Sequence, residues 1–487
     1  MTLRIDAGAI RRAAFLPAPL RACAFAAAAL CCAPLAAQQP KEDFTLFADK
    51  AVALTHVEIV DGTGAAARRD QTLLIRDGRI VGAGPFASTA IPQDMKVRDL
   101  AGHTVTPGFV MMHEHMFYPT SMGNYVEMLR SFPRLYLAGG ATTVRTAGSM
   151  STSGDINLRN EIAKGNIPGP DIDVTAPFIE GPGLLFLKVK ITKDPDDARA
   201  LVNYWAKEGA TSYKVYMSIP RATLSAVVEE AHKRGQKVTG HLCSITYREA
   251  ADLGIDNLEH GFLASTDFVK NKAPDVCPSQ ADAQKALEDL DPDGPEAGAL
   301  IQHLIAKKVA LTSTLTIFET FAAGRPIAPA GALELLTPDL REQYVTRWAS
   351  IAQQGAAQWP KILRNGMRLE KRFVESGGVL MAGTDPTGYG GVVPGFSNVR
   401  EVELLVETGF SVADAIHIAT MNGARFLGRD ADIGSLEPGK RADLILFKGS
   451  VSADPKALRQ LQWTMKAGVA YDSPRILSAM KGRVGLY

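Results

Sequence analysis

Four histidines and one aspartate lie where the chain leaves apolar, strand-like runs. His113 and His115 follow the run TVTPGFVMM, His241 ends KVTGH, His260 ends NLEH and Asp385 ends VLMAGTD. Imidazole and carboxylate groups are ligands that Zn²⁺ and similar divalent cations prefer. Each motif alone has a common structural explanation, such as a turn or ordinary packing. Their shared position at strand ends predicts a metal site, provided that the fold brings the strands together.

The pair His113 and His115 carries a further geometric signal. In an extended strand, residues i and i+2 face the same side. Both imidazoles can therefore reach one metal ion from a single strand end. This spacing supports the interpretation of the histidines as ligands.

Lys214 lies within the apolar run TSYKVYM. A buried lysine is costly unless its charge is paired or removed. The sequence leaves two explanations open. Lys214 could pair with a Glu or Asp inside the core, or its amine could become a CO₂-derived carbamate, an anion able to bridge two cations. Lys188 and Lys190 are alternative lysines in a predicted loop.

The elements that must position these side chains form an alternating pattern. Helical spacing of apolar residues predicts helices at 194–208, with Asp194 as N-cap, and at 220–235. Strand candidates alternate with such patterns at 104–112, 141–147, 171–177, 211–217, 237–242, 257–260, 309–315 and 378–384. Eight repeats predict an α/β fold, a (β/α)₈ TIM barrel whose strand ends meet at one rim. A doubly wound open sheet is the alternative, but no GxGxxG follows the first strand.

The two ends of the chain are rich in β patterns. Asp77-Gly78 predicts a hairpin turn within residues 71–84. We therefore expect residues 42–107 and 425–487 to form a composite β-sandwich domain around a barrel of residues 108–424. Long connections at 261–296 and 317–340 would lie on the barrel face that carries active sites.

Charge and the amino terminus constrain location and partners. Lys plus Arg total 53 and Asp plus Glu total 52, giving a net charge of +1 in 487 residues. This balance argues against a nucleic-acid partner.

A basic start and the apolar stretch 22–37 predict a signal peptide over residues 1–37, with export to the periplasm or the medium and no stable membrane span after processing. A retained anchor helix is the alternative. Cys243 and Cys277 remain after cleavage, and the sequence leaves their pairing open.

Several motifs together resemble the amidohydrolase superfamily. They are VTPGFVMMHEH (105–115), YKVYM (213–217), KVTGHL (237–242), NLEHG (257–261), AGTDP (382–386), TMNGARFLG (420–428) and IGSLEPGKRADLILF (433–447). The resemblance is to binuclear members related to imidazolonepropionase and to prolidase-like carboxypeptidases, a group that includes ochratoxin-hydrolysing amidases. It implies a barrel with a composite β-sandwich, in agreement with the pattern above.

The resemblance also implies roles for the residues. It implies two divalent ions, Zn²⁺ being expected although Mn²⁺ and Co²⁺ share the ligands. The implied ligands are His113, His115 and Asp385 for the first ion, His241 and His260 for the second, and a carboxylated Lys214 as the bridge. Asp385 would take the proton from a metal-bridging hydroxide and pass it to the leaving nitrogen.

These roles predict a hydrolase of C–N amide bonds in small N-acyl amino acids or dipeptides, including bulky aromatic amides. A cyclic-amide or imidazolone hydrolase and a lactonase are alternatives on the same fold, and a non-catalytic exported metal-binding protein is an alternative of another class. The expected partner is a small amide or peptide, and a homo-oligomer is possible.

The relatives imply residues for substrate binding near the bridging lysine. Tyr216 and Arg221 are expected to hold a substrate carboxylate, Arg221 through a bidentate pair. Capping of a helix is the equal alternative for Arg221. Further candidates for the pocket walls and an apolar rim are Tyr118, Tyr389, Met116, Phe117 and Phe262.

Overall fold

The computed structural model describes residues 43–486 apart from 122–123, 183–188, 355–356 and 388–389. The expected signal peptide, Tyr389 and Lys188 lie outside the described residues. Within the described part of the chain, none of the helices combines the length and the apolar character that crossing a membrane requires.

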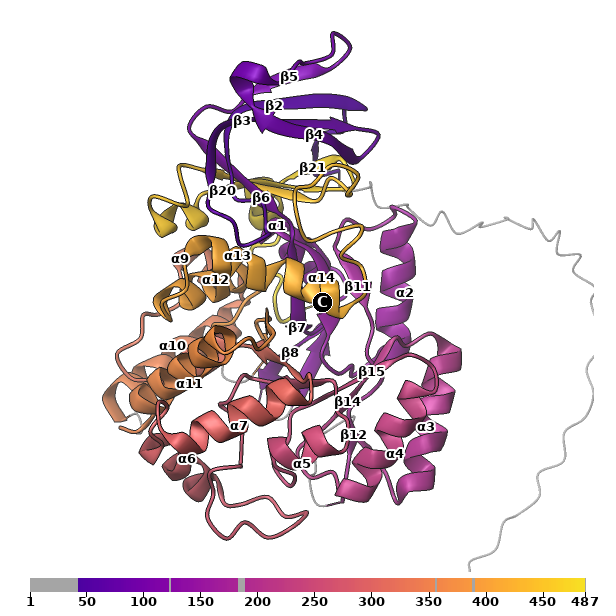
Figure 1. Ribbon diagram of the computed structural model, residues 1–487, viewed down its shortest axis with the longest axis vertical. Helices are drawn as coiled ribbons and strands as arrows, with labels where there is room; N and C mark the ends of the chain where they lie inside the picture. The colour runs from indigo at the N-terminus through magenta and orange to yellow at the C-terminus, as the bar shows by residue number, and fades with distance from the viewer. Residues whose placement is uncertain (1–42, 122–123, 183–188, 355–356, 388–389, 487) are drawn as a thin grey trace, which may run out of the picture. The chain divides into compact units, whose positions relative to one another are not determined.

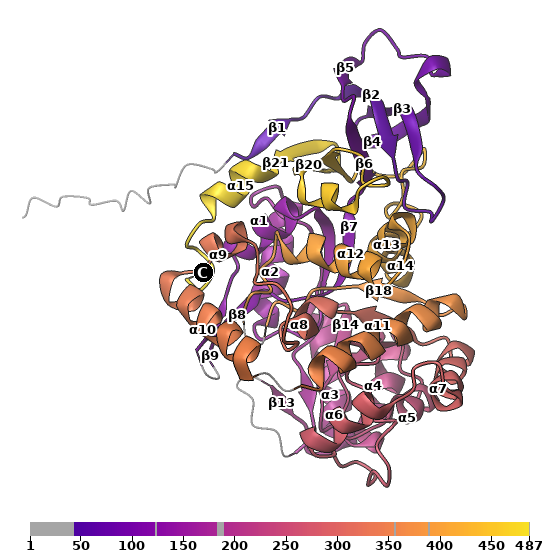
Figure 2. The same cartoon turned by 90° about the vertical axis from the view of Figure 1, so that its left-hand side faces the viewer.

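Parallel strands form the central barrel (Figures 1 and 2). They are β7 (Phe109–Glu114), β10 (Ala141–Thr146), β11 (Asp171–Asp173), β14 (Ser212–Val215), β15 (Lys237–Gly240), β16 (Asn257–Glu259), β17 (Ala310–Ser313) and β18 (Leu380–Ala382). They pair in two arcs, β7–β10–β11 and β14 to β18, and β12 (Ile179–Glu180) and β13 (Lys190–Ile191) extend the second arc. The predicted strand positions are therefore confirmed.

Backbone contacts join the two arcs at both ends. Thr175 forms a parallel bridge with Ser212, which connects the chain after β11 to β14. The N–H groups of Thr384 and Asp385 each donate to the carbonyl of His113 at 3.0 Å, which connects the end of β18 to β7. This closure gives the (β/α)₈ barrel expected from the sequence.

Most of the helices follow barrel strands. They are α1 (Ser131–Ala138), α2 (Thr152–Ala163), α3 (Pro195–Glu208), α4 (Arg221–His232), α5 (Tyr247–Asp252), α7 (Pro295–Ala306), α11 (Trp359–Glu375), α12 (Ser397–Glu407), α13 (Val412–Ala419) and α14 (Met421–Phe426). The predicted cap of α3 is present, because the Asp194 side chain accepts a hydrogen bond from the Asp197 N–H.

Strands from both ends of the chain form one nine-stranded sheet. These are β1 (Thr45–Phe47), β2 (Ala51–Ile59), β3 (Arg68–Arg76), β4 (Arg79–Pro85), β5 (Lys96–Asp99), β6 (His103–Pro107), β19 (Leu444–Lys448), β20 (Leu461–Lys466) and β21 (Val469–Asp472). The ends meet where β6 pairs antiparallel with β19, so that indigo and yellow strands adjoin in Figure 1. The edge strand β4 contacts residues 439–442, where the Ile80 N–H donates a hydrogen bond to the carbonyl of Lys440. The folded-over sheet encloses its own apolar core.

The first predicted strand, 104–112, differs from the structure in one respect. It divides at Gly108 into β6, which belongs to the nine-stranded sheet, and β7, which begins the barrel. A Cβ at Gly108 would lie 2.3 Å from the Thr142 Oγ1 atom, so a larger residue has no room at this crossing. The apolar pattern runs through the division because both halves are buried.

The long connections contain short elements that were not predicted. The segment 261–296 holds α6 (Gln280–Asp289), and α8 (Leu315–Glu319), α9 (Ala330–Leu335) and α10 (Pro338–Gln354) occupy the region around 317–340. A hairpin of β8 (Phe117–Ser121) and β9 (Asn124–Glu127) follows β7, and α15 (Ser473–Ala479) follows β21. Cys243 and Cys277 form a disulfide, which settles the question that the sequence left open and ties the segment before α6 to the end of β15.

Candidate metal centre

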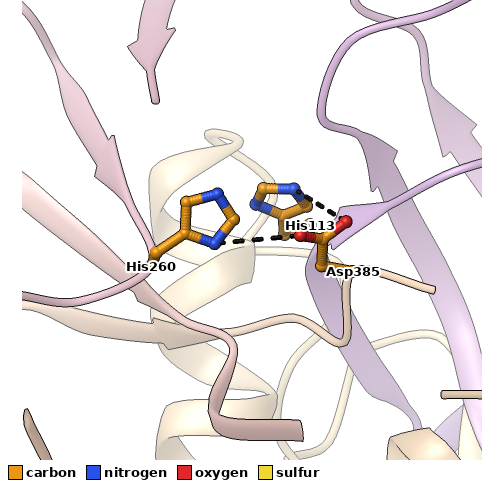
Figure 3. Close-up of side chains that lie close together, drawn as sticks. All are labelled: His113, His260 and Asp385. Atoms are coloured by element: carbon orange, nitrogen blue, oxygen red, sulfur yellow. Dashed lines mark ion pairs between the residues drawn. The ribbon is translucent and has the colours of Figure 1, made fainter. Parts of the chain in front are cut away.

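Three side chains from separate strand ends converge at the rim of the barrel (Figure 3). One ligand atom each of His113, His260 and Asp385 lies within 4.8 Å of the other two. His113 Nε2 is 3.7 Å from Asp385 Oδ1, and His260 Nδ1 is 3.9 Å from Asp385 Oδ2. All three residues are buried. The barrel therefore brings together three candidate ligands, one on β7 and the others just after β16 and β18.

The remaining two histidines join the same cluster. His115 Nε2 lies 3.2 Å from Asp385 Oδ1, while its Nδ1 lies 3.2 Å from the carbonyl of Gly148. His241 Nδ1 lies 2.9 Å from His260 Nε2. A histidine that donates one ring N–H to a carbonyl presents its other nitrogen as a ligand. The contact between His115 and Gly148 thus directs the Nε2 atom of His115 toward Asp385.

The backbone at two of these positions is unusual. His260 has φ +70° and Asp385 has φ +48°, which place both in the left-handed region that favours glycine. Non-glycine residues in this conformation concentrate at functional sites, because the surrounding structure must hold them there. The turn at His260 also ends the alternation of β16, so that Glu259 and His260 both reach the barrel interior.

Glu259 supports the histidines from inside the barrel. Its Oε2 accepts a hydrogen bond from His113 Nδ1 at 2.7 Å, and its Oε1 accepts one from Arg145 Nη2 at 2.8 Å. Thr239 also donates to Oε1. Burial would raise the pKa of Glu259, but Lys214, His113 and Arg145 hold it well below its usual value. Glu259 is therefore ionised, and it orients His113 with Nε2 toward Asp385.

Lys214 lines the same cavity as the histidines, and its Nζ lies 3.7 Å from Glu259 Oε1. Burial lowers the pKa of the Lys214 ammonium to about 8, although Glu259 opposes this shift. The position of Lys214 is therefore compatible with both explanations that the sequence left open. The lysine is beside a buried carboxylate, and it also faces the ligand cluster. The alternative Lys190 is exposed on β13.

The protonation states of the cluster suit a divalent cation. Burial lowers the pKa of His113 to about 4 and that of His241 to about 3, and it also lowers the pKa of His260. Burial would raise the pKa of Asp385, but His113 and His115 hold it well below its usual value. At neutral pH His113, His241 and His260 are thus neutral imidazoles beside the ionised Asp385. This donor set fits Zn²⁺ or a related divalent ion.

The cluster lies in a cavity of about 810 Å³. Tyr216 lines it, with its ring centroid 5.1 Å from that of His241. Phe117, from the expected rim, also lines the cavity, whereas Met116 and Phe262 are buried in the hydrophobic core instead. Tyr118 is likewise buried in the core and is not among the described lining residues. The cavity thus retains Tyr216 and Phe117 from the predicted walls.

Arg221 does not reach this cavity. It begins α4, and its guanidinium contacts Asp275 Oδ1 at 3.1 Å and Glu249 Oε1 at 3.1 Å. Both of its charge partners come from the protein, and it is not among the described lining residues, so its expected role in binding a substrate carboxylate stays a prediction. The alternative, that Arg221 caps a helix, is wrong in detail, because the N-cap of α4 is Pro220 and no side chain caps this helix.

The sequence pattern did not single out Glu259, Arg145 or Thr239. A usable signal was present, since Arg145 and Glu259 are opposite charges in otherwise apolar predicted strands. Buried charges are stable only when they are paired. Two such opposite charges, on β10 and β16 of one barrel, would have indicated an ion pair across the barrel interior.

A closed parallel barrel with histidines and an aspartate at its strand ends defines a class of metal-dependent hydrolytic enzymes. The sequence model of the amidohydrolase family matches residues 104–475, and the chain belongs to this family. The resemblance seen in the motifs is thereby confirmed. Members of the family bind divalent metals, and the described residues supply a site for them.

Individual relatives are similar over limited segments or in fold. A 5-methylthioadenosine/S-adenosylhomocysteine deaminase of Symbiobacterium thermophilum is 57% identical over 38 residues, 8% of this chain and 9% of that protein. An imidazolonepropionase of Stenotrophomonas maltophilia is 34% identical over 95 residues, 18% of this chain and 23% of that protein. The matched segments thus span less than a quarter of either relative.

Solved structures match over most of the chain. A Bifidobacterium longum protein described provisionally as a prolidase has a TM-score of 0.61 and 26% identity, covering 88% of this chain and 99% of its own. The ochratoxinase of A. niger has a TM-score of 0.61 and 17% identity, covering 87% and 96%. The second likeness concerns the fold alone.

Proposed function

We propose that the protein is a two-metal hydrolase that cleaves C–N amide bonds in small amides or peptides. One observation carries the proposal. Four histidines, Asp385 and Lys214, which lie on or just after five barrel strands, line one cavity. A purely structural metal site is closed and needs no cavity of this size. The prolidase-like and ochratoxinase neighbours are consistent with amide chemistry.

The chain's own residues have distinct roles in this proposal. Bound divalent ions would supply a nucleophile at neutral pH and polarise the substrate carbonyl. The first ion would bind to His113, His115 and Asp385, and the second to His241 and His260; Lys214, once carboxylated by CO₂, would supply an anionic ligand to both. Asp385 is ionised and lines the cavity, so it would accept a proton from the nucleophile and return it to the leaving nitrogen.

A hydrolysis screen tests the proposal. The protein is loaded with Zn²⁺, Mn²⁺ or Co²⁺ and given N-acyl amino acids, dipeptides, aromatic amides, cyclic amides and lactones, while released amine, acid and ammonia are measured. We expect amide hydrolysis that a chelator abolishes. Preferential opening of lactones or release of ammonia from a deaminated ring would contradict amide cleavage. If the protein hydrolyses none of these substrates after metal loading, the non-catalytic alternative is supported.

Replacing Lys214 tests the metal bridge. We expect Lys214→Ala to reduce the bound metal from about two ions per chain to about one and to lower kcat at least ~100-fold, because a bridging anion is lost. A short carboxylic acid such as propionate should restore part of the second ion and of the activity. Elemental analysis and hydrolysis assays measure both effects.

The exposed Lys190→Ala variant is the matched control, and it should keep full metal content. A fully active Lys214→Ala variant would show that the lysine is only the ion-pair partner of Glu259.

We also propose that the protein is exported. The pattern of residues 1–37 and the disulfide between Cys243 and Cys277 support this, because disulfides persist mainly outside the cytosol. Amino-terminal sequencing of the protein recovered after cell fractionation tests it. A start near residue 38 is expected in the exported fraction, and an intact amino terminus in the cytosol would contradict it.

A further inference from the structure

The helix α6 forms part of the wall of the cavity that holds the metal-centre residues. Four of its residues line this cavity: Gln280, Ala283, Gln284 and Leu287. Their spacing of i, i+3, i+4 and i+7 places them on one face of the helix. On the other side of the helix, Ala281 is exposed and the side chain of Lys285 is 65% exposed. The cavity wall is therefore one helix thick at this point.

The disulfide fastens the segment that leads into α6. Cys277 lies two residues before Ser279, the N-cap of α6, and it is bonded to Cys243 just after β15. Both cysteines line the cavity. Cys243 is two residues from His241, so the covalent bond joins the beginning of α6 to the chain that carries a metal-centre histidine.

An ion pair fastens the same segment at a second point. Asp275 accepts three hydrogen bonds from Arg221, from the backbone N–H at 2.9 Å, from Nε at 3.1 Å and from Nη2 at 3.3 Å. Arg221 is the first residue of α4, and its Nη1 donates to Glu249 on α5 at 3.1 Å. Lys272 adds a hydrogen bond to the carbonyl of Ser244. Because a guanidinium that contacts both oxygens of a carboxylate fixes its orientation, Arg221 connects the segment before α6 to two helices of the barrel.

The other end of α6 is held by α11, beside which it packs (Figure 1). The buried Asn365 on α11 donates to the carbonyl of Leu287 at 2.9 Å and to that of Leu290 at 3.2 Å. An isolated helix of ten residues is marginally stable in water. The position of α6 therefore depends on the contacts at its two ends.

We propose that α6 limits the size of the substrate that reaches the metal centre, and that the Cys243–Cys277 disulfide and the Arg221–Asp275 ion pair are the two clamps that hold it in place. This rests on the proposed amide hydrolysis. A wall held at both ends keeps the cavity at one size, whereas a loosened wall offers the substrate fewer fixed contacts. Arg221 and Asp275 are positioning residues, because they act on the substrate through α6.

Enlarging one side chain on the cavity face of α6 tests the size limit. With the metal-loaded full chain, Ala283→Phe should raise KM for N-benzoyl-L-phenylalanine about 10-fold or more and leave KM for N-acetylglycine within about two-fold, because only the larger amide needs the space. Ala281→Phe is the control, since it adds the same ring at an exposed position of α6. Ala283→Leu, with the same expected direction, serves where the phenylalanine variant folds poorly. An equal change for both substrates, or none, would overturn the size limit.

A double-mutant cycle tests the two clamps. Cys243→Ser/Cys277→Ser and Arg221→Ala should each raise KM for N-benzoyl-L-phenylalanine by less than about 3-fold, because the remaining clamp still holds α6. The three substitutions together should raise it about 30-fold or more, above the product of the separate changes. In every variant, kcat and bound metal should stay within about two-fold of the natural protein. Effects that simply multiply would show that the two contacts do not hold the same element.

Replacing the acidic partner separates positioning from direct contact between Arg221 and the substrate. In the disulfide-free protein, Asp275→Asn should also raise KM for N-benzoyl-L-phenylalanine about 10-fold or more, because the ion pair is lost. Asparagine tolerates the left-handed backbone at this position, where φ is +57°. Arg199→Ala in the same protein is the control, since it breaks an ion pair with Glu229 on α4, away from α6. A KM that rises with Arg221→Ala but not with Asp275→Asn would assign the arginine to the substrate and overturn this clamp.

Hydrogen exchange and ligand binding provide readouts that do not depend on hydrolysis. The backbone amides of residues 280–289 should exchange about 10-fold faster or more when both clamps are removed, while those of β15 keep their rate. Calorimetric titration should show N-benzoyl-L-phenylalanine binding about 10-fold more weakly to Ala283→Phe than to the natural protein. If both results are obtained and no amide is hydrolysed, the inference on α6 stands and the proposed reaction fails. Unchanged exchange in α6 would overturn the clamps, and equal binding would overturn the size limit, whatever the reaction is.

Discussion

A single buried carboxylate, Glu259, connects the metal ligands to the barrel interior. It is fully buried, it touches His113 and Arg145 directly, and it lies beside Lys214. A buried charge of this kind is stable only as long as all of its partners are present. Glu259 therefore acts on the site through His113, as a positioning residue.

Replacing this carboxylate by an amide should separate positioning from charge. We expect Glu259→Gln to weaken divalent metal binding 10–100-fold, because the amide keeps only one acceptor oxygen for His113 on one side and for Arg145 and Thr239 on the other. The free energy of unfolding should fall by about 3–5 kcal/mol, because Arg145 is left buried without its ion-pair partner. Metal titration and urea unfolding measure the two effects.

The exposed Glu208→Gln variant on α3 is the control and should change neither quantity. An unchanged metal affinity in Glu259→Gln, with stability lowered, would assign Glu259 a structural role only.

At this scale the sequence predicted the ligands better than their surroundings. The histidines and Asp385 were found because a barrel places strand ends at one rim, whatever their separation along the chain. The ion pairs of Arg221 with Asp275 and Glu249 could not be predicted, because they depend on the path of a loop. Glu259 was missed because its partners lie on other strands.

At the scale of elements, one hydroxyl joins a barrel strand to two helices. Ser313 Oγ, at the end of β17, lies 2.8 Å from both Glu370 on α11 and Glu401 on α12. One hydroxyl proton cannot serve two carboxylates, so at least one carboxyl group must carry its own proton. Burial raises the pKa of Glu370 to about 8, with a contribution from Glu401, and burial raises that of Glu401 to about 7.

This arrangement predicts a pH dependence of stability. Glu370 keeps a proton in the folded chain that it loses in the unfolded chain above about pH 4.5. Its contribution is therefore complete below about pH 4.5 and is lost as the pH rises through about 8. Between about pH 4.5 and pH 8, the free energy of unfolding of the natural protein, measured with urea, should fall relative to that of Glu370→Gln by about 1.4 kcal/mol per pH unit.

The Glu375→Gln variant controls for a change of charge on the same helix, since Glu375 is exposed. Parallel pH profiles for the natural protein and Glu370→Gln would contradict a protonated Glu370.

The elements themselves were largely predictable, since strand positions follow from apolar runs and helices such as α3 from spacing and caps. The short helices α6, α8 and α9 were not, because they lack a long apolar period and are held by contacts with the barrel. The division of the first strand at Gly108 was also hidden, because both halves are apolar. Tertiary contacts, and not local pattern, decide these features.

At the scale of the whole molecule, an ion cluster links the barrel to the nine-stranded sheet. Asp171 on β11 lies 2.7 Å from Lys466, 2.8 Å from Arg441 and 2.9 Å from Arg429. Burial would raise the pKa of Asp171, but Lys466 and Arg441 hold it well below its usual value. The cluster therefore stabilises the contact between the two parts when Asp171 is ionised.

Removing the negative charge should loosen this contact. We expect Asp171→Asn to lower the free energy of unfolding by about 1–3 kcal/mol at pH 7, less than for a fully buried pair because the carboxylate is partly exposed. The difference should begin to shrink as the pH falls below about 3.8, where the unfolded aspartate takes up a proton, and it should vanish only at a pH well below this value, where the folded aspartate is protonated as well. Asp196→Asn, at a side chain that is 97% exposed, is the control and should have no effect. A loss of stability that persists at low pH would contradict the electrostatic origin.

The pairing of β6 with β19 has a consequence for biosynthesis. Residues 103–107 meet their neighbours 444–448 only after nearly the whole chain has been made. Until then β6 presents an open edge, which can pair with another chain, while the barrel strands between them can already assemble. A chain that ends before β19 thus keeps an unpaired edge on β6 that can associate with other chains. Synthesis of β19 covers this edge.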